Sequence, residues 1–234
     1  MYKIFIGYDQ KEAVSFHALS HSLLRHAEVP ISITPITQNS LTRIYSRPSD
    51  PRQSNSFSFT RFLVPYLCNY EGCALYMDCD MLVTENIGGL FDELKAKDEA
   101  VHVVKHEYKS KMSTKYLGNK NYHYPRKNWS SFVFWNCGAT ANSAITPDLV
   151  SSAEPAFLHR FQWLKDEDIG ELGTEWNFLV GEYDKKDVVP KNIHWTLGGP
   201  YFNEFSNADY AEMWNEEYRL MINCEQLNSP KKND

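Results

Sequence analysis

The sequence predicts a single α/β domain built around a mainly parallel sheet. A strand at Lys3–Tyr8, a helix after Asp9 and a second strand at Ile31–Ile36 open the chain, and this strand–helix–strand order favours parallel pairing. The 234 residues suffice for one well-buried core. Neither an internal repeat nor a linker divides them, so we expect one domain over residues 1–228 and a polar, disordered tail over 229–234.

Capping and periodicity define the first helix. Asp9 is a good N-cap residue, and Glu12 stands three positions on, where a capping box places its carboxylate. Beyond the second strand, Ser40–Ser58 is polar and predicts a loop, and Phe59–Leu67 predicts a helix that Pro65 kinks or breaks. The apolar residues of the first helix recur at helical spacing: Phe16, Leu19, Leu23 and Leu24.

The rest of the chain continues to alternate between strand and helix patterns. The loop at Lys109–Asn128 is rich in Tyr and Lys, and we expect it to close as a lid over a bound substrate. The predicted elements are, in order, a strand at Ala74–Val83, a turn and short helix at Asn86–Leu94, a strand at Ala100–His106, the loop at Lys109–Asn128, a strand entering a turn at Ser130–Ala139, helical segments through Gly173–Tyr183, and a strand with a Gly-Gly-Pro turn at Asn192–Phe202.

Composition narrows the class of protein. The net charge of −6 does not favour general attraction to nucleic acid or anionic lipid. No apolar run approaches the roughly 20 residues that span a bilayer, and the N-terminal apolar stretch is too short for a signal peptide. The five cysteines fit neither a zinc ribbon nor a disulfide framework. We therefore expect reduced thiols, a cytoplasmic location, no nucleic-acid partner and no integral membrane segment.

The segment "ALYMDCDMLV" places two carboxylates, Asp78 and Asp80, at the end of a buried strand. Alternate residues of a strand share a face, so the two side chains can converge. Burying them is costly unless they are paired or bind a metal, and carboxylates suit Mg²⁺ and Mn²⁺. Ligands of open α/β sheets sit at the carboxyl ends of strands, so this pair is a candidate metal site; the alternative is two solvated turn residues.

A third candidate ligand is His194, which stands near the end of a later strand beside a glycine turn. Imidazole is an acceptable Mn²⁺ ligand and a poorer one for Mg²⁺, and the alternative is an ordinary core or surface histidine. His17 and His21 are four residues apart but have no carboxylate motif nearby, so we expect them on a helix surface.

In these ordered blocks, from about Lys3 to Phe202, the chain resembles the family 8 glycosyltransferases, the group of glycogenin and the bacterial lipopolysaccharide galactosyltransferases. The resemblance implies a GT-A fold, which is a single Rossmann-like domain with a mixed, mainly parallel sheet flanked by helices. It also implies transfer of a sugar, with retention, from a nucleotide-diphosphate sugar, expected to be a UDP-sugar, to a glycan or other hydroxyl acceptor. The implied cofactor is Mn²⁺ or Mg²⁺.

Each block of the resemblance implies roles for individual residues. "LYMDCDMLV" resembles the family's Asp-x-Asp, so Asp78 and Asp80, with Cys79 between them, would hold the metal and the donor. "HWTLGGPYF" resembles the block that places His194 on the metal and Gly198 and Gly199 near the diphosphate. The remaining blocks imply that Tyr8 and Asp9 hold the base, that Arg61 lies near the donor, that Asn136 and Gly138 border the donor sugar, and that Glu175 and Asn177 lie near the transferred sugar.

Two departures from the family pattern affect these roles. The last block has Gly199 where the family has a Lys, so part of the charge that neutralises the diphosphate must come from elsewhere. The acidic segment reads Thr174-Glu175 in place of Asp-Gln-Asp. Retention could proceed by front-face attack, with the departing phosphate taking the acceptor proton, or through Glu175 as a nucleophile.

Two rival functions and one structural question stay open at this stage. A sugar nucleotidyltransferase also uses an α/β sheet and a carboxylate-bound metal, but it needs a Gly-rich loop after the first strand, where this chain has a single glycine. A non-catalytic carbohydrate-binding domain of the same fold is the other rival. The segment Lys127–Trp135, with Trp129, is either an acceptor wall or part of the core.

Overall fold

We describe a computed structural model of the chain over residues 1–48, 55–110, 112–118, 120–121 and 123–223. The tail expected to be disordered, 229–234, lies outside the described residues. Within the described part, no helix is long and apolar enough to cross a lipid bilayer.

The elements alternate along the chain much as the sequence predicts. The strands are β1 (Tyr2–Gly7), β2 (Ile31–Ile36), β3 (Cys73–Met77), β4 (Met81–Val83), β5 (Val101–Val104), β6 (Phe132–Asn136), β7 (Ile169–Leu172), β8 (Phe178–Leu179) and β9 (Asn192–His194). The α-helices are α1 (Ala13–His26), α2 (Val64–Leu67), α3 (Gly88–Leu94), α4 (Pro147–Ser152), α5 (Pro155–His159) and α6 (Ala211–Ile222). Short 3₁₀ helices connect them, among them η1 (Gln10–Glu12), η3 (Thr60–Leu63), η5 (Trp129–Ser131) and η8 (Thr174–Asn177).

The central sheet is mixed. Its six strands run in the order β2-β1-β3-β6-β5-β7, and a second sheet has the order β4-β9-β8. The pairs β1–β2, β1–β3 and β5–β7 are parallel, whereas β6 runs antiparallel to both β3 and β5. The expected α/β fold with a mixed sheet is confirmed, and the antiparallel β6 decides which residues reach each sheet edge.

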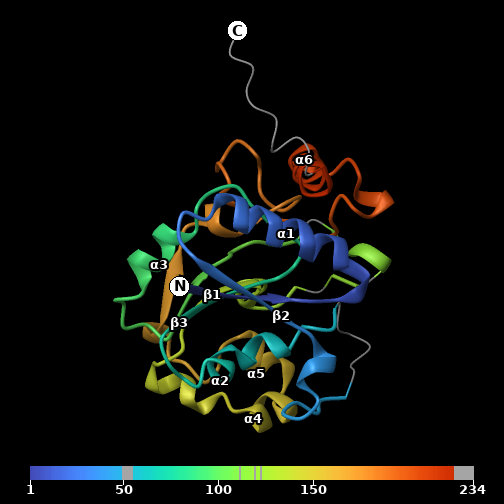
Figure 1. Cartoon of the computed structure of the whole chain (residues 1–234). Helices are drawn as coiled ribbons and strands as arrows, with labels where there is room; N and C mark the ends of the chain where they lie inside the picture. Colours follow the sequence, from blue (N-terminus) through green and yellow to red (C-terminus); the bar gives the residue numbers. More distant parts are fainter. Residues whose placement is uncertain (49–54, 111, 119, 122, 224–234) are drawn as a thin grey trace.

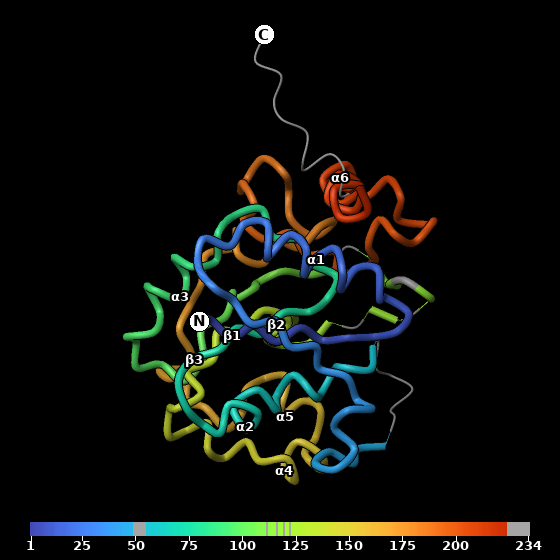
Figure 2. The backbone as a smooth tube through the Cα atoms, in the orientation of Figure 1, coloured from blue at the N-terminus to red at the C-terminus, as the bar shows by residue number. Residues whose placement is uncertain are grey.

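Helices cover both faces of the sheet (Figure 1). Helices α1 and α6 lie on one side, and α2, α4 and α5 lie on the other, as the backbone trace also shows (Figure 2). Strand β1 contributes side chains to the hydrophobic cores on both faces of the sheet, because successive side chains of a strand point to opposite faces. Ile4 and Ile6 pack with α1, and Phe5 packs with η3, α2, α4 and α5.

Helix α1 forms its buried face largely as its periodicity predicts. Phe16, Leu19 and Leu23 are buried, but Leu24 is 60% exposed and lies off that face. The predicted capping box is wrong, because Asp9 caps η1 through the N–H of Lys11 and the Glu12 carboxylate accepts from Tyr201 at 2.7 Å. The 3₁₀ turn separates the two residues from the start of α1.

Candidate functional site

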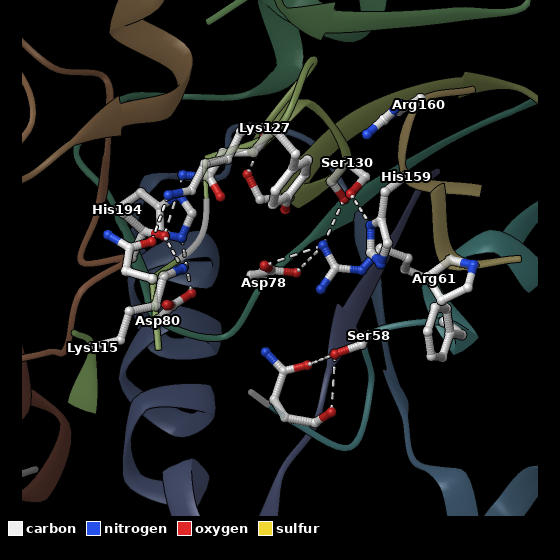
Figure 3. Close-up of a pocket in the computed structure, with 18 of the residues that line it drawn as sticks. Ser58, Arg61, Asp78, Asp80, Lys115, Lys127, Ser130, His159, Arg160 and His194 are labelled. Atoms are coloured by element: carbon white, nitrogen blue, oxygen red, sulfur yellow. Dashed lines mark hydrogen bonds and ion pairs between the residues drawn. The ribbon is translucent and has the colours of Figure 1, made fainter. Parts of the chain in front are cut away.

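A cavity of about 380 Å³ opens at the sheet edge where β3 ends (Figure 3). Parallel strands β1 and β3 both finish at this edge, and antiparallel β6 begins there. The cavity therefore receives residues that follow β3, residues that precede β6 and the end of β9. Four predicted site residues line it: Arg61, Asp78, Asp80 and His194.

Asp78 follows β3 directly, and two side chains hold its carboxylate. The Tyr76 hydroxyl donates to Asp78 Oδ1 at 2.8 Å, and Arg61 Nη1 lies 3.0 Å from Oδ1 and 3.2 Å from Oδ2. The same guanidinium nitrogen donates to the backbone oxygen of Ser130 at 2.8 Å. Burial raises the pKa of Asp78, and the Arg61 charge opposes that rise. The pairing fixes the carboxylate at the cavity wall.

Asp80 and His194 meet because β4 pairs with β9. Met81 lies opposite His194 in this antiparallel pair, and the Trp195 N–H donates to the Asp80 carbonyl at 3.0 Å. His194 Nε2 and Asp80 Oδ1 lie 3.3 Å apart, yet Oδ1 is buried without an aligned hydrogen-bond donor. Burial acts to raise the pKa of Asp80, but the charge on a protonated His194 and the Lys115 charge lower it overall.

A relay behind His194 assigns its tautomer. Ser131 Oγ donates to the Asn128 carbonyl at 2.7 Å, so this hydroxyl must accept from the Asn177 amide, whose Nδ2 lies 2.9 Å away. The Asn177 oxygen then faces His194 Nδ1 at 2.8 Å and accepts its proton. In the neutral imidazole, Nε2 therefore carries a lone pair directed at Asp80.

These three side chains fit a divalent cation. One ligand atom each from Asp78, Asp80 and His194 lies within 4.8 Å of the others. The buried, unpartnered Asp80 oxygen and the histidine lone pair are two acceptors facing each other, which a shared cation satisfies. Two carboxylates and an imidazole form a donor set that suits Mn²⁺, and the hydrogen bond from Nδ1 is the usual support for a histidine ligand.

Cations line much of the remaining wall. Lys115 Nζ donates to Thr196 Oγ1 at 3.2 Å, two residues past His194, so this lysine brings positive charge close to the candidate metal site. Burial lowers the pKa of Lys115, and burial with the Lys115 charge lowers the pKa of Lys127 to about 8. The other lining cations beside Arg61 are Lys120 and Arg160.

Sequence reasoning did not single out these cations. The Lys-rich composition of Lys109–Asn128 is the signal that could have found Lys115, Lys120 and Lys127. The sequence also predicts that this segment is a lid. Three of its residues, 111, 119 and 122, lie outside the described residues, and the lid stays a prediction.

Asn136 and Gly138 do not border the cavity, so their assignment is corrected. Asn136 pairs with Cys73 at the beginning of β3, and Gly138 N donates to Gly72 O at 3.3 Å, at the opposite sheet edge from Asp78. The reason is that β6 runs antiparallel, so its first residues, not its last, reach the site.

Glu175 and Asn177 also differ from their expected roles. The Glu175 carboxylate lies 3.8 Å from Lys191 Nζ and does not line the cavity. Asn177 is fully buried, with both ends of its amide used by His194 and Ser131. It positions the histidine and has no free group to offer a sugar.

The glycine turn and Cys79 make close packing contacts, and their expected roles near the donor and its diphosphate stay predictions. Gly198 has a φ of +147°, and a Cβ there would come 2.4 Å from the Phe205 ring. A Cβ on Gly199 would come 2.1 Å from the Tyr201 ring. Cys79 is fully buried in a core cluster. None of these three residues lines the cavity.

Tyr8 and Asp9 follow β1 at the same sheet edge but do not line the cavity. Asp9 Oδ2 accepts from the Ser56 N–H at 2.9 Å, and the Tyr8 carbonyl accepts from Ser56 Oγ at 3.1 Å. Trp129 is partly buried, and its indole N–H donates to the His106 carbonyl at 3.2 Å. Trp135, in contrast, is fully buried core.

No family model matches the chain. Protein CDI of Arabidopsis thaliana is 41% identical over 222 residues, which cover 92% of this chain and 85% of that protein. Among solved structures, the chain resembles the bifunctional glycosyltransferase WbbM, with a TM-score of 0.65 and 17% identity over 93% of this chain. The match covers 49% of WbbM, so the chain spans about half its length.

Two further structures match most of the chain. The glycosyltransferase GlyE of Streptococcus pneumoniae has a TM-score of 0.61 and 19% identity, over 100% of this chain and 66% of GlyE. The galactosyltransferase LgtC, solved with donor and acceptor sugar analogues, has a TM-score of 0.59 and 13% identity over 98% of each chain. At these identities the likeness shows a shared fold, that of the GT-A glycosyltransferases.

Proposed function

We propose that this chain, which belongs to the family of Protein CDI from Arabidopsis thaliana and has the GT-A fold, is a metal-dependent glycosyltransferase. In this proposal it moves a sugar from a nucleotide-diphosphate sugar, expected to be a UDP-sugar, to the hydroxyl group of a glycan or other acceptor, with retention. The assignment to family 8 is part of the same proposal.

One observation carries the proposal: Asp78, Asp80 and His194 come together from two strand ends inside one cavity. His194 is more than a hundred residues away from the two aspartates in the sequence, so local turn chemistry does not explain the cluster. In open α/β folds, this edge is where ligands bind. Its walls also bring cations to a site whose proposed ligand is a diphosphate.

In this proposal, different residues of the site assist different aspects of the departure of the diphosphate leaving group. Asp78, Asp80 and His194 would hold the divalent ion, which when bound supplies positive charge to the leaving diphosphate. Asn177 keeps the imidazole in the tautomer that presents Nε2. We assign Lys115, which donates to Thr196, to the diphosphate, in place of the Lys that the resemblance leads us to expect at Gly199.

The described lining favours front-face attack over a covalent intermediate. Its carboxylates are Asp78 and Asp80, both assigned to the ion, and Glu175 lies outside the cavity against Lys191. In front-face attack the departing diphosphate accepts the proton of the acceptor hydroxyl, so no further carboxylate is required. Arg61 and Ser130 then form the wall beside the reacting sugar.

The test is UDP release from a panel of UDP-sugars, with and without Mn²⁺. Wild type should release UDP only with the ion, and Asp80→Asn should lose this activity by roughly two orders of magnitude or more. Asp98→Asn, at an exposed carboxylate outside the cavity, is the matched control. UDP release that is equal with and without Mn²⁺ would contradict the proposal.

The same panel separates the rival functions. A sugar nucleotidyltransferase would release pyrophosphate from a nucleoside triphosphate and a sugar 1-phosphate, and would leave UDP-sugars intact. A carbohydrate-binding domain would bind a sugar without turnover in either assay.

A further inference from the structure

One end of the cavity lies at α5, across Arg61 from the metal-binding group. Arg61 Nη1 contacts both Asp78 and the Ser130 carbonyl, and Ser130 Oγ in turn lies 3.0 Å from His159 Nδ1. Figure 3 shows Asp80 and His194 on one side of Asp78, with His159 and Arg160 on the other. A group bound at α5 would therefore sit beside the centre that we assign to the donor.

Positive charge in the cavity exceeds what the proposed reaction uses. Five cationic side chains and two carboxylates line it among the described residues. A divalent ion and a doubly charged diphosphate cancel each other, so a surplus of positive charge remains when both are bound. Arg61 faces Asp78, Lys115 lies at the metal end, and Lys127 donates to the Asn121 side chain. Arg160 follows α5 directly and brings positive charge to the α5 end.

Arg160 has no anionic partner among the described residues. It makes no ion pair with them, and its Nε is buried without a hydrogen-bond acceptor. Its backbone is held in place, because Arg126 donates to the Arg160 carbonyl at 2.6 Å while Asp166 neutralises Arg126. A buried donor of a charged group is costly to leave unmet, and a guanidinium fork matches a carboxylate or phosphate.

The walls around Arg160 suit a sugar ring. Phe59, Pro155 and Ala156 give the α5 end an apolar side, on which the C–H face of a pyranose can pack. His159 is neutral near pH 7, because burial and the Arg61 and Arg47 charges lower its pKa to about 3. It contributes hydrogen bonding and no charge.

We propose that the α5 end of the cavity, formed by Phe59, Pro155, Ala156, His159 and Arg160, binds an anionic sugar unit, either a uronic acid or a sugar phosphate, through Arg160. This inference rests on the proposed function for its placement beside the donor. It defines the substrate as acidic, which the glycosyltransferase assignment alone does not.

Saturation-transfer NMR tests it with glucuronate, glucose 6-phosphate and glucose as probes. The protein is measured alone and with UDP and Mg²⁺, which avoids paramagnetic broadening. At least one charged sugar should bind roughly tenfold more tightly than glucose, as expected for a charge-assisted hydrogen bond to a buried donor. High salt should reduce the preference, and the better of the two charged probes identifies the acidic group.

Variants assign the preference to Arg160. Arg160→Gln should bring the charged sugar and glucose to within about twofold of each other, and Arg160→Lys should keep part of the difference. Lys165→Gln, an exposed cation paired with Glu167 outside the cavity, should behave as wild type. Melting temperatures show that each variant is folded.

Equal binding of glucose and the charged sugars by wild type would overturn the inference, as would a full preference in Arg160→Gln. Loss of the charged sugar when UDP and Mg²⁺ bind would also overturn it, because Arg160 would then serve the nucleotide. Failure of UDP and the ion to bind is a separate result that counts against the proposed function.

Discussion

At the residue scale, the Asp78–Asp80–His194 group depends on neighbours that satisfy each ligand in a fixed orientation. Tyr76 and Arg61 hold Asp78, and Asn177 holds His194. The sequence predicts the three candidate ligands, because strand-end carboxylates and a distal histidine are visible in it. It does not predict the role of Asn177, because a side chain's partners depend on strands that are distant along the chain.

The Asn177 relay gives the first prediction. Asn177→Ala should lower Mn²⁺ affinity, measured with UDP present, by roughly 10- to 100-fold, the usual cost of removing the partner of a histidine ligand. Asn192→Ala is the matched control, because Asn192 is also fully buried but bonds to the Trp176 carbonyl and not to His194. Equal Mn²⁺ affinity in the two variants would show that Asn177 does not support His194 as a metal ligand.

The buried His106 should make the stability of the fold depend on pH. Burial, with the charge of a protonated His194, lowers the pKa of His106 to about 3. Between pH 6.5 and about 3 the unfolded chain therefore binds a proton that the folded chain does not. Because of this residue, the free energy of unfolding should fall by up to about 1.4 kcal/mol for each pH unit as the pH drops through that window.

Urea unfolding at a series of pH values measures this slope. His106→Gln should flatten it relative to wild type, and His17→Gln, at an exposed histidine, should not. The same slope in the His106 variant would mean that other groups cause the acid sensitivity.

At the element scale, the sequence predicts those segments whose partners are close along the chain. The second strand has its predicted bounds, Ile31–Ile36, and pairs with β1 as the opening pattern suggests. The sequence predicts helical structure through Gly173–Tyr183, but this segment contains only η8 before Phe178–Leu179 forms β8 against β9. That pairing partner follows more than ten residues later, and no local pattern shows it.

The sequence pattern does not predict helix α6, because the buried face of this helix contains a charged residue. Ala211, Trp214 and Glu217 are buried at helical spacing, and the glutamate interrupts the apolar stripe. Glu217 accepts from Arg25 at 2.8 Å and contacts His21 at 2.6 Å, both on α1. His21 is thus a contact between helices, while His17 is exposed as expected.

From this contact we predict that Glu217 contributes to the stability of the fold by holding α6 on α1. Glu217→Gln should lower the free energy of unfolding by about 1–3 kcal/mol, because a buried charged hydrogen-bond acceptor is removed. Glu216→Gln, one residue earlier and exposed, should change it by less than about 0.5 kcal/mol. Chemical denaturation measures both. A Glu217 variant as stable as the Glu216 variant would show that apolar packing alone holds α6 on α1.

At the scale of the whole molecule, topology decides which motif residues meet. The α/β class and the parallel start of the sheet follow from the order of elements. The direction of β6 does not, and a parallel β6 would have brought Asn136 and Gly138 to the edge where Asp78 lies. Because β6 is antiparallel, Ser130 and Ser131 line the cavity in their place. Lys115 and Arg160 likewise reach the cavity from segments with no recognisable site motif.

The central claim is that Asp78, Asp80 and His194 hold a divalent ion beside a nucleotide diphosphate. Anomalous diffraction from crystals grown with Mn²⁺ and UDP tests it most directly. The account predicts a manganese peak bound by both carboxylates and by His194 Nε2, with the UDP diphosphate on the same ion. A cavity that contains UDP without manganese at these residues, or a manganese peak elsewhere, would contradict it.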